Sequence, residues 1–462
     1  MTVDLPVADM PVSNTRFTSA SYESVRARNG GARARLRHAS AQYARRSVDR
    51  LIPPGWRVLA IPDFRRLWLA HAGSVIGDGF HAIAITWLVF QTLGGGPQAL
   101  AVLGIASLIP ALALGILSGT IVDRLDRRRV MVGTDLIRAG LVAVLALLVA
   151  SGNASVPMVI VMGMLLTLAA LFFYPARNSV LPAYVAREEL VPANALMQAT
   201  AQGSQLLAPA IGGVLFVAVG PVGLLAIDAA SFVWSAIFIS RLTPGPALPG
   251  PAPRRPLLHE AADGLRFIAG HAPSRLCVLT GAANQLFASG PWRVIVPAWV
   301  AVALGGGAIE YGTIMSAFAA GLVAANVVVS GIRARLPLVT LIALGVFVDG
   351  AIEVLFAFSP TLAFAAIALF AMGVANAVLN ASFSALMQVS VPHDMRGRTF
   401  ATFSTGIQLT TPLSLAATGA VASVAGPVAI LTIAGVGLMA VGAISFVGSL
   451  RVGPAIRSAA SA

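Results

Sequence analysis

The stretch Gly119-Thr-Ile-Val-Asp123-Arg124-Leu125-Asp126-Arg127-Arg128-Arg129 lies between two long apolar segments and carries the densest charge in the part of the chain that we expect to fold. Hydrocarbon cannot hold such a run, because one Arg at the centre of a bilayer costs at least about 2.5–3.5 kcal/mol. The stretch therefore predicts a tight loop at a membrane face. Its positive charge indicates the cytoplasmic face.

The composition of the whole chain indicates a helical membrane protein that crosses the bilayer many times. Of the 462 residues, 57% are hydrophobic and only 11% are charged, and the mean hydropathy is +0.84. All 31 basic residues are Arg, and the net charge is +13. These Arg residues are scattered between apolar segments, so we attribute the charge to membrane orientation and expect no nucleic-acid partner. The one cysteine, Cys277, lies in an apolar segment, which excludes an intrachain disulfide.

The apolar segments between residues 67 and 449 predict twelve transmembrane helices, each long enough to cross about 30 Å of hydrocarbon. If the N-terminus is cytoplasmic, the loops that carry Arg fall on the cytoplasmic side. The opposite loops, such as Leu-Gly-Gly-Gly-Pro-Gln and Phe-Ser-Pro-Thr, contain no Arg. A miscounted span would spoil this sorting. We therefore expect a multi-pass protein of a bacterial-type plasma (inner) membrane with both termini in the cytoplasm.

A Pro-rich stretch divides the predicted spans into two sets of six. The segment Gly203-Ser-Gln-Leu-Leu-Ala-Pro209 in span five resembles Gly406-Ile-Gln-Leu-Thr-Thr-Pro412 in span eleven, which indicates an internal duplication. We expect five regions in chain order: a basic, disordered cytoplasmic tail (1–58), an N-terminal half (59–240), a cytoplasmic linker (241–274), a C-terminal half (275–450) and a C-terminal cytoplasmic tail (451–462).

The charged loop resembles the loop 2–3 signature of the major facilitator superfamily, G-x-x-x-D-R/K-x-G-x-R/K-R/K. Asp126 stands where the family form has Gly, and we expect it in a tight turn with positive φ. The resemblance implies a gating loop that latches the two halves in the outward-facing state, with Arg128 clamping the end of an adjacent helix. The alternative is a plain positive-inside anchor, which would need neither an acid nor a glycine. The matching residues are Gly119, Asp123, Arg124, Arg128 and Arg129.

Span five carries Gln205-Leu-Leu-Ala-Pro209-Ala-Ile-Gly212-Gly213, which is similar to the G-P-x-x-G-G motif of drug–proton antiporters of this superfamily. Small residues let helices approach closely and Pro bends a helix, so this segment predicts a hinge. The alternative is ordinary Gly-rich packing.

Two further stretches are similar to the enterobactin-exporter and macrolide-efflux branch of the superfamily: Phe173-Tyr-Pro-Ala-Arg-Asn178 and Pro392-x-x-x-Arg-Gly-Arg398. The resemblance implies an all-α membrane fold of twelve transmembrane helices in two pseudo-symmetric six-helix halves. The predicted fourth span lacks the intramembrane Arg that many drug–proton antiporters carry. No role in proton coupling is therefore expected of that position.

Ionisable residues inside the spans are candidates for proton coupling or for lining a substrate cavity, since a charge in lipid is costly. Asp78 lies in span one. Asp349 and Glu353 share one helical face of span nine, and two such carboxylates cannot both stay ionised in a low dielectric. Alternatively, Asp349 accepts a structural hydrogen bond and Glu353 reaches the outer interface. Arg293 in span seven could contact an anionic substrate or pair with a carboxylate.

Asp135 and Arg138 are three residues apart in span three, and we expect a structural ion pair near its cytoplasmic end.

The motifs that are missing narrow the function. A chain without Lys cannot contain the G-x-x-x-x-G-K-[ST] loop, so we do not expect ATP-driven transport by this chain alone. We expect no enzyme activity, no catalytic residue, no metal and no cofactor. The sequence predicts a monomeric secondary active transporter that exports amphipathic small molecules, drug-like or siderophore-like, driven by proton influx through alternating access. The alternatives are uptake or lipid flipping by the same fold, and a membrane sensor or scaffold that does not transport.

Overall fold

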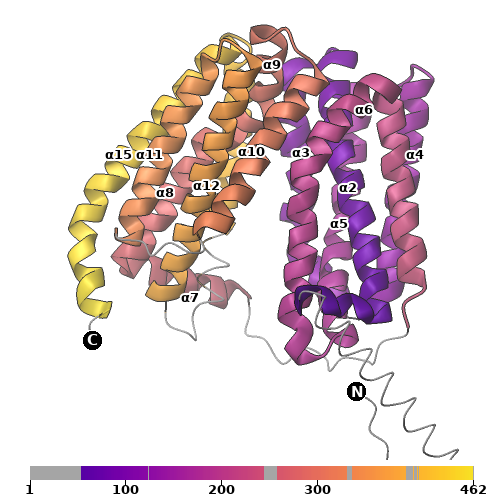
Figure 1. Ribbon diagram of the computed structural model, residues 1–462, viewed down its shortest axis with the longest axis horizontal. Helices are drawn as coiled ribbons and strands as arrows, with labels where there is room; N and C mark the ends of the chain where they lie inside the picture. Colours follow the sequence, from indigo (N-terminus) through magenta and orange to yellow (C-terminus); the bar gives the residue numbers. More distant parts are fainter. Residues whose placement is uncertain are drawn as a thin grey trace, which may run out of the picture. The chain divides into compact units, whose positions relative to one another are not determined.

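The computed structural model describes residues 54–122, 124–243, 257–329, 336–391, 399, 403 and 405–460. The chain divides into two compact units, residues 1–60 and 61–462. The described residues of the first unit form one 3-10 helix, Pro54–Ala60. In the described ranges of the second unit, the secondary structure is helical (Figure 1).

The N-terminal half of the second unit begins with α2, which continues into a π-helical turn, η2. A Pro in the first turn of α2 and of α5 starts each helix, because proline has no N–H to leave unpaired there. The elements are α2 (Pro62–Trp87), η2 (Leu88–Thr92), α3 (Gly96–Val122), α4 (Arg127–Ala150), α5 (Val156–Tyr184), η3 (Arg187–Glu189) and α6 (Leu190–Ser240).

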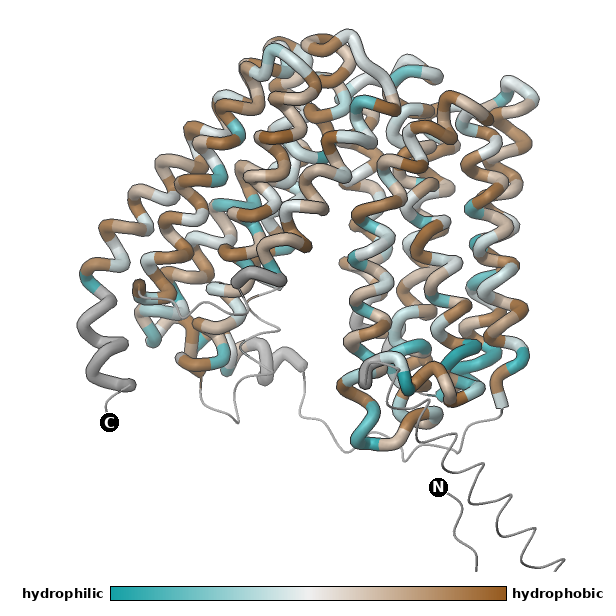
Figure 2. Tube along the Cα trace, in the orientation of Figure 1, coloured by the Kyte–Doolittle hydropathy of each residue, from teal (hydrophilic) through white to brown (hydrophobic). Residues whose placement is uncertain are grey.

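The C-terminal half follows the same plan, and its first membrane helix also contains a π-helical turn, η4. The elements are α7 (Leu257–Gly270), α8 (Ala272–Gly290), η4 (Pro291–Ile295), α9 (Val296–Ala303), α10 (Ala308–Val329), α11 (Leu338–Ala357), α12 (Leu362–Ser390), α14 (Thr410–Val421) and α15 (Pro427–Ala460). Hydrophobic residues recur along the coloured parts of the membrane helices, as a bilayer requires (Figure 2).

The described residues contain ten helical segments that are long and apolar enough to cross a membrane. One of them, Arg187–Ser240, is 54 residues long and covers predicted spans five and six. Gly220 interrupts it with φ 67° and ψ −176°, a conformation that only glycine adopts freely. In predicted span eleven, α14 has 12 residues and the chain just before it is described only in part. The fold class is therefore confirmed, whereas the number twelve stays a prediction.

Helix contacts repeat between the two halves as a duplication requires. In the first half α3 packs on α5, and α4 packs on both α5 and α6. In the second half α10 packs on α12, and α11 packs on both α12 and α15. The halves meet along two seams that also correspond, α6 with α10 and α3 with α14. This pattern is the internal symmetry that the paired motifs in spans five and eleven predicted.

Small residues allow the helices to touch along both seams. A Cβ on Gly213 would collide with the Ala308 carbonyl of α10, and a Cβ on Gly312 would collide with the Pro209 carbonyl of α6. The Ala210 N–H donates to Ser316 Oγ at 3.0 Å across the same seam. On the second seam, a Cβ on Gly419 would lie 2.6 Å from the Ala101 Cβ.

Candidate functional site

A cavity of about 630 Å³ lies between the two halves, enclosed by α2, α5, α6, α10 and the π-helical turn η4. The polar residues of its wall come from the N-terminal half: His71, Ser74, Asp78, Arg177, Asn194, Gln198, Ser204 and Gln205. The residues that the C-terminal half contributes are aromatic or apolar: Trp292, Tyr311, Met315, Phe318, Ala319 and Leu322. The two walls thus differ sharply in polarity.

Asp78 projects into this cavity from the middle of α2 and is half-buried. The glycines on either side of it bring α2 close to α6. A Cβ on Gly77 would lie 2.6 Å from the Ser231 Cβ, and a Cβ on Gly79 would collide with Ala208. Close packing on both sides of Asp78 fixes the position of this segment of α2 against α6.

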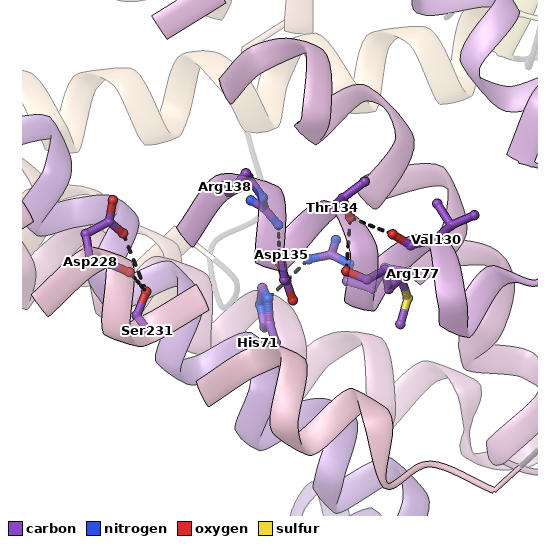
Figure 3. Close-up of polar contacts among 9 residues, drawn as sticks. His71, Val130, Thr134, Asp135, Arg138, Arg177, Asp228 and Ser231 are labelled. Carbon is purple, nitrogen blue, oxygen red and sulfur yellow. Dashed lines mark hydrogen bonds and ion pairs between the residues drawn. The ribbon is translucent and has the colours of Figure 1, made fainter. Parts of the chain in front are cut away.

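Arg177, near the end of α5, lies on the same wall and binds neutral groups. Its Nη1 lies 3.1 Å from His71 Nδ1 (Figure 3), and its Nη2 donates to Asn178 Oδ1 at 3.2 Å. Its guanidinium carbon lies 5.2 Å from the centre of the Tyr174 ring. His71 ties this group to α6, because its Nε2 is 3.2 Å from the Met197 carbonyl oxygen.

The facing wall is built around an aromatic pair. The Trp292 and Phe318 rings lie 4.7 Å apart between centroids, and Tyr311 of α10 also lines the cavity. An apolar molecule of moderate size fits such a wall, because aromatic side chains offer large contact area at low cost in conformational entropy.

The interior of the N-terminal half holds a second polar cluster, behind the cavity. Arg138 Nη2 donates to Asp135 Oδ1 at 2.6 Å, and both residues are buried (Figure 3). The Arg138 guanidinium lies between two rings, 4.5 Å from the Phe173 centroid and 4.3 Å from that of Phe232. This is the contact that the spacing of Asp135 and Arg138 predicted, and neither residue lines the cavity.

Asp228 of α6 belongs to the same interior and was not a site candidate from the sequence. Its Oδ2 lies 2.8 Å from His81 Nδ1 of α2, and its carbonyl accepts from Ser231 Oγ at 2.8 Å. Asp228 is buried. Ionisable groups of α2, α4 and α6 therefore gather in one half of the protein.

Asp349 and Glu353 are both buried on α11, away from the residues that line the cavity. α11 packs tightly on α15 beside them, because a Cβ on Gly350 would lie 2.5 Å from the Gly435 carbonyl oxygen. Asp349 Oδ1 has no hydrogen-bond partner among the described residues. Glu353 does not project outward, contrary to the alternative that places it at the outer interface.

Arg293 lies in η4 next to Trp292, and its side chain is exposed. It is not among the residues that line the cavity. No carboxylate of the described residues lies within 4.0 Å of it.

The gating-loop motif lies at the junction of α3 and α4. Gly119 is in the last turns of α3, Arg124 is in the following turn, and Asp123 lies outside the described residues. Arg128 Nη2 donates to the carbonyl oxygen of Ser240, the last residue of α6. Arg128 therefore binds the end of a helix in its own half. This hydrogen bond does not connect the two halves.

The expectation of positive φ at Asp126 is wrong. Its φ is −65° and its ψ is 106°, and its carboxylate accepts from the Arg129 N–H at 3.1 Å. Asp126 is the N-cap of α4, a position at which Asp is among the preferred residues. It replaces the family's Gly by satisfying a free N–H of the helix end, and the Arg129 side chain lies 3.6 Å from it.

The hinge-motif residues divide between the cavity and the seam. Gln205 and Pro209 line the cavity. Gly212 is buried against Phe80 and Ile83 of α2, and Gly213 faces α10 as described above. The segment thus connects the substrate-facing surface with the contact between the halves.

Several cavity residues were not candidates from the sequence, notably His71, Arg177 and Gln198. Arg177 had served only as part of the Phe173–Asn178 resemblance and as one of the Arg residues of the predicted cytoplasmic side. One signal in the sequence was available. Arg177 follows the apolar residues of its helix so closely that it can lie within the helix rather than in a loop.

The model of the "Transmembrane secretion effector" family matches residues 54–462. The chain belongs to this family, a branch of the major facilitator superfamily. Members of the superfamily are transporters rather than enzymes.

Curated relatives match over part of their length. The chain is 32% identical to the multidrug efflux pump Tap of Mycobacterium tuberculosis over 202 residues, which are 42% of this chain and 48% of the pump. It is 27% identical to macrolide efflux protein A of Streptococcus pyogenes over 177 residues, 38% of this chain and 44% of that protein. The chain therefore spans about half the length of the curated relatives it matches.

Solved structures confirm the fold over nearly the whole second unit. A bacterial homologue of the iron transporter ferroportin, in an inward-facing state, has a TM-score of 0.67 at 14% identity, covering 84% of this chain and 98% of that one. A bacterial homologue of the human lysosomal transporter Spinster has a TM-score of 0.66 at 13% identity, covering 84% of this chain and 97% of that one. Together, family and fold identify a multi-pass membrane protein.

Proposed function

We propose that this protein is a secondary active exporter of amphipathic small molecules, driven by proton influx through alternating access. The observation that carries the proposal is the cavity between the halves, with a polar wall from one half and an aromatic wall from the other. A site between two six-helix halves suits a mechanism in which the halves rock around a bound substrate. Export in particular is supported by the names of the relatives, which are a multidrug efflux pump and a macrolide efflux protein.

Loading from the cytoplasm is supported by the position of the contacts between the halves. On α10 the seam residues are Ala308, Gly312 and Ser316, next to the Arg-free loop that precedes this helix. On α6 the seam lies at Pro209 to Gly213, toward the Arg-free bend at Gly220, whereas the cavity extends the other way, toward Asn194. The halves thus touch on the predicted outer side, and the cavity lies on the predicted cytoplasmic side.

Proton coupling is assigned to the carboxylates of the membrane interior. Asp78 is the first candidate, because it alone of the predicted acids lies on the cavity wall, where substrate and proton can compete. Asp349 and Glu353 form a second candidate site, outside the lining of the cavity. We assign a structural role to Asp135 and Arg138. The gating loop and the hinge segment are assigned the control of the opening of the cavity.

In the cell we propose a monomer in a bacterial inner membrane with both termini cytoplasmic. The Arg content of the loops supports this orientation. The described residues that line the cavity lie in the membrane helices.

The test is transport by the purified protein in liposomes with an imposed pH gradient, using a panel of amphipathic dyes. We expect dye movement opposite to the proton gradient, abolished by a protonophore. Asp78→Asn and Asp349→Asn should each reduce gradient-driven transport while the protein still inserts. Full activity in both variants overturns the coupling assignment. Movement of dye in the same direction as protons identifies uptake, and movement of labelled lipid alone identifies a flippase.

A further inference from the structure

Arg177 is a cation on the cavity wall without an anionic partner among the residues that the structure describes. No described carboxylate lies within 4.0 Å of its guanidinium. Arg138, in the same half, is instead neutralised by Asp135 at 2.6 Å. A half-buried guanidinium that faces a cavity is costly unless an anion joins it there.

The groups that do bind Arg177 are all neutral. Asn178 offers an amide oxygen and Tyr174 an aromatic ring. His71 is neutral too, because its Nδ1 faces an Arg177 N–H and must be unprotonated to accept from it, which leaves the ring proton on Nε2, facing the Met197 carbonyl. Its Nδ1 then accepts from Arg177 Nη1.

The guanidinium retains hydrogen-bonding capacity. It has five N–H groups, and its bonds from Nη1 to His71 and from Nε and Nη2 to Asn178 use three of them. One N–H on each terminal nitrogen remains. Two terminal N–H groups match the two oxygens of a carboxylate, a phosphate or a sulfonate, which is the pairing that Arg makes best.

We infer that Arg177 binds the anionic headgroup of an amphipathic substrate whose apolar body lies along the aromatic wall at Trp292 and Phe318. The inference rests on the proposed transport function and adds the charge of the substrate to it. The cavity lining on α2 runs from His71 to Ile83, a stretch of thirteen residues or about 18 Å of helix, which is long enough for a headgroup and a two- or three-ring body.

A purely structural role for Arg177 makes a different prediction. If its function is only to tie α5 to α2 through His71, replacing it changes the binding of charged and uncharged ligands equally. If it receives an anion, the replacement removes the preference for the anion and leaves the binding of the apolar body.

The experiment is equilibrium dialysis of three probes that share one apolar body: naphthalene-2-carboxylate, naphthalene-2-carboxamide and 2-naphthylmethylammonium. The full chain is held in phosphatidylcholine nanodiscs, and empty nanodiscs correct for partition into lipid. We expect the wild type to bind the carboxylate at least about tenfold more tightly than the amide. Arg177→Gln, which keeps a hydrogen-bond donor, should bind both equally, and Arg177→Lys should keep part of the preference.

Arg266→Gln is the matched control, since Arg266 is exposed on α7 outside the cavity and its loss removes the same formal charge. It should keep the full preference. No preference in the wild type, no binding of the carboxylate, or an unchanged preference in Arg177→Gln overturns the inference. If Arg177→Gln does not fold, the wild-type series and Arg177→Lys decide. The assay uses no gradient, so a failure of proton-driven transport in liposomes leaves its result intact.

Discussion

The two walls of the cavity are built from corresponding halves but differ in chemistry. The wall from the N-terminal half carries Asp78, His71 and Arg177, whereas the wall from the C-terminal half is aromatic and apolar around Trp292 and Phe318. A duplicated fold has therefore kept its helix contacts and diverged in the residues that face the cavity. The two halves therefore contribute differently to the cavity. The N-terminal half offers charge and hydrogen bonds, and the C-terminal half offers contact area.

The interiors of the halves differ in the same direction. In the N-terminal half the buried Arg138 is paired with Asp135 and held between two aromatic rings. In the C-terminal half the buried acids Asp349 and Glu353 have no cation within 4.0 Å among the described residues. The buried Arg138 is thus compensated within its own half, whereas the buried acids of the C-terminal half have no described cation in contact.

The largest effect should come from breaking the compensated pair. Arg138→Met leaves Asp135 buried without its partner, and we expect the free energy of unfolding to fall by about 3–5 kcal/mol. Asp349 has no described cation in contact, so Asp349→Asn should change the free energy of unfolding by less than about 1 kcal/mol. Denaturant unfolding in detergent micelles measures both. Equal losses in the two variants would contradict the contrast between the halves, and Asp135→Leu added to Arg138→Met should recover part of the loss.

The seam between the halves should respond next. Gly213→Ala places a Cβ against the Ala308 carbonyl, whereas Gly203→Ala on the same helix meets nothing within 4 Å. We expect Gly213→Ala to lower transport in liposomes at least about tenfold, since a clash of about 1–3 kcal/mol opposes closure of the seam. Gly203→Ala should stay within about twofold of the wild type, because Ala favours the helix. A large loss in Gly203→Ala would mean that helix composition rather than the seam is limiting.

The aromatic wall should affect affinity but not charge preference. Phe318→Ala removes one ring of the Trp292 pair, and we expect all three naphthalene probes to bind about tenfold more weakly. The ratio of carboxylate to amide binding should remain that of the wild type. A change in this ratio would show that the two walls do not act separately.

The smallest effect should come from the N-cap of α4. Asp126→Ala leaves the Arg129 N–H without its acceptor and should destabilise the start of α4 by about 1 kcal/mol, whereas Asp126→Gly should cost only a few tenths. Hydrogen exchange of the first amides of α4 in nanodiscs measures the difference. Equal exchange in the two variants would contradict the capping role.

The fold was predictable because its signals are additive along the chain. The lengths of the apolar segments predict the spans, and the distribution of Arg between the loops predicts which side of the membrane each loop faces. The charged loop after α3 was a starting point for both predictions. Local backbone geometry was less accessible. Asp126 was expected in a positive-φ turn because the family has Gly there, but a side chain that accepts from its own helix changes the conformation that the position prefers.

The site was only partly predictable, because cavity membership depends on how each helix is rotated. Asp78 and Asp349 look alike in the sequence, as acids in the middle of apolar spans, yet one lines the cavity and the other is buried against a neighbouring helix. Arg177 was noted from the sequence only within the Phe173–Asn178 stretch of the family resemblance and on the predicted cytoplasmic side, and its place on the cavity wall follows from the length of α5, which continues to Tyr184.

Proton coupling through Asp78 is tested most directly by substrate transport by Asp78→Asn in liposomes, with and without a pH gradient. We predict that the variant loses gradient-driven accumulation, by at least about tenfold, while exchange of substrate across the membrane without a gradient stays within about twofold of the wild type. That result would assign proton coupling to the carboxylate on the cavity wall. Gradient-driven accumulation at the wild-type level in Asp78→Asn would contradict proton coupling through this carboxylate.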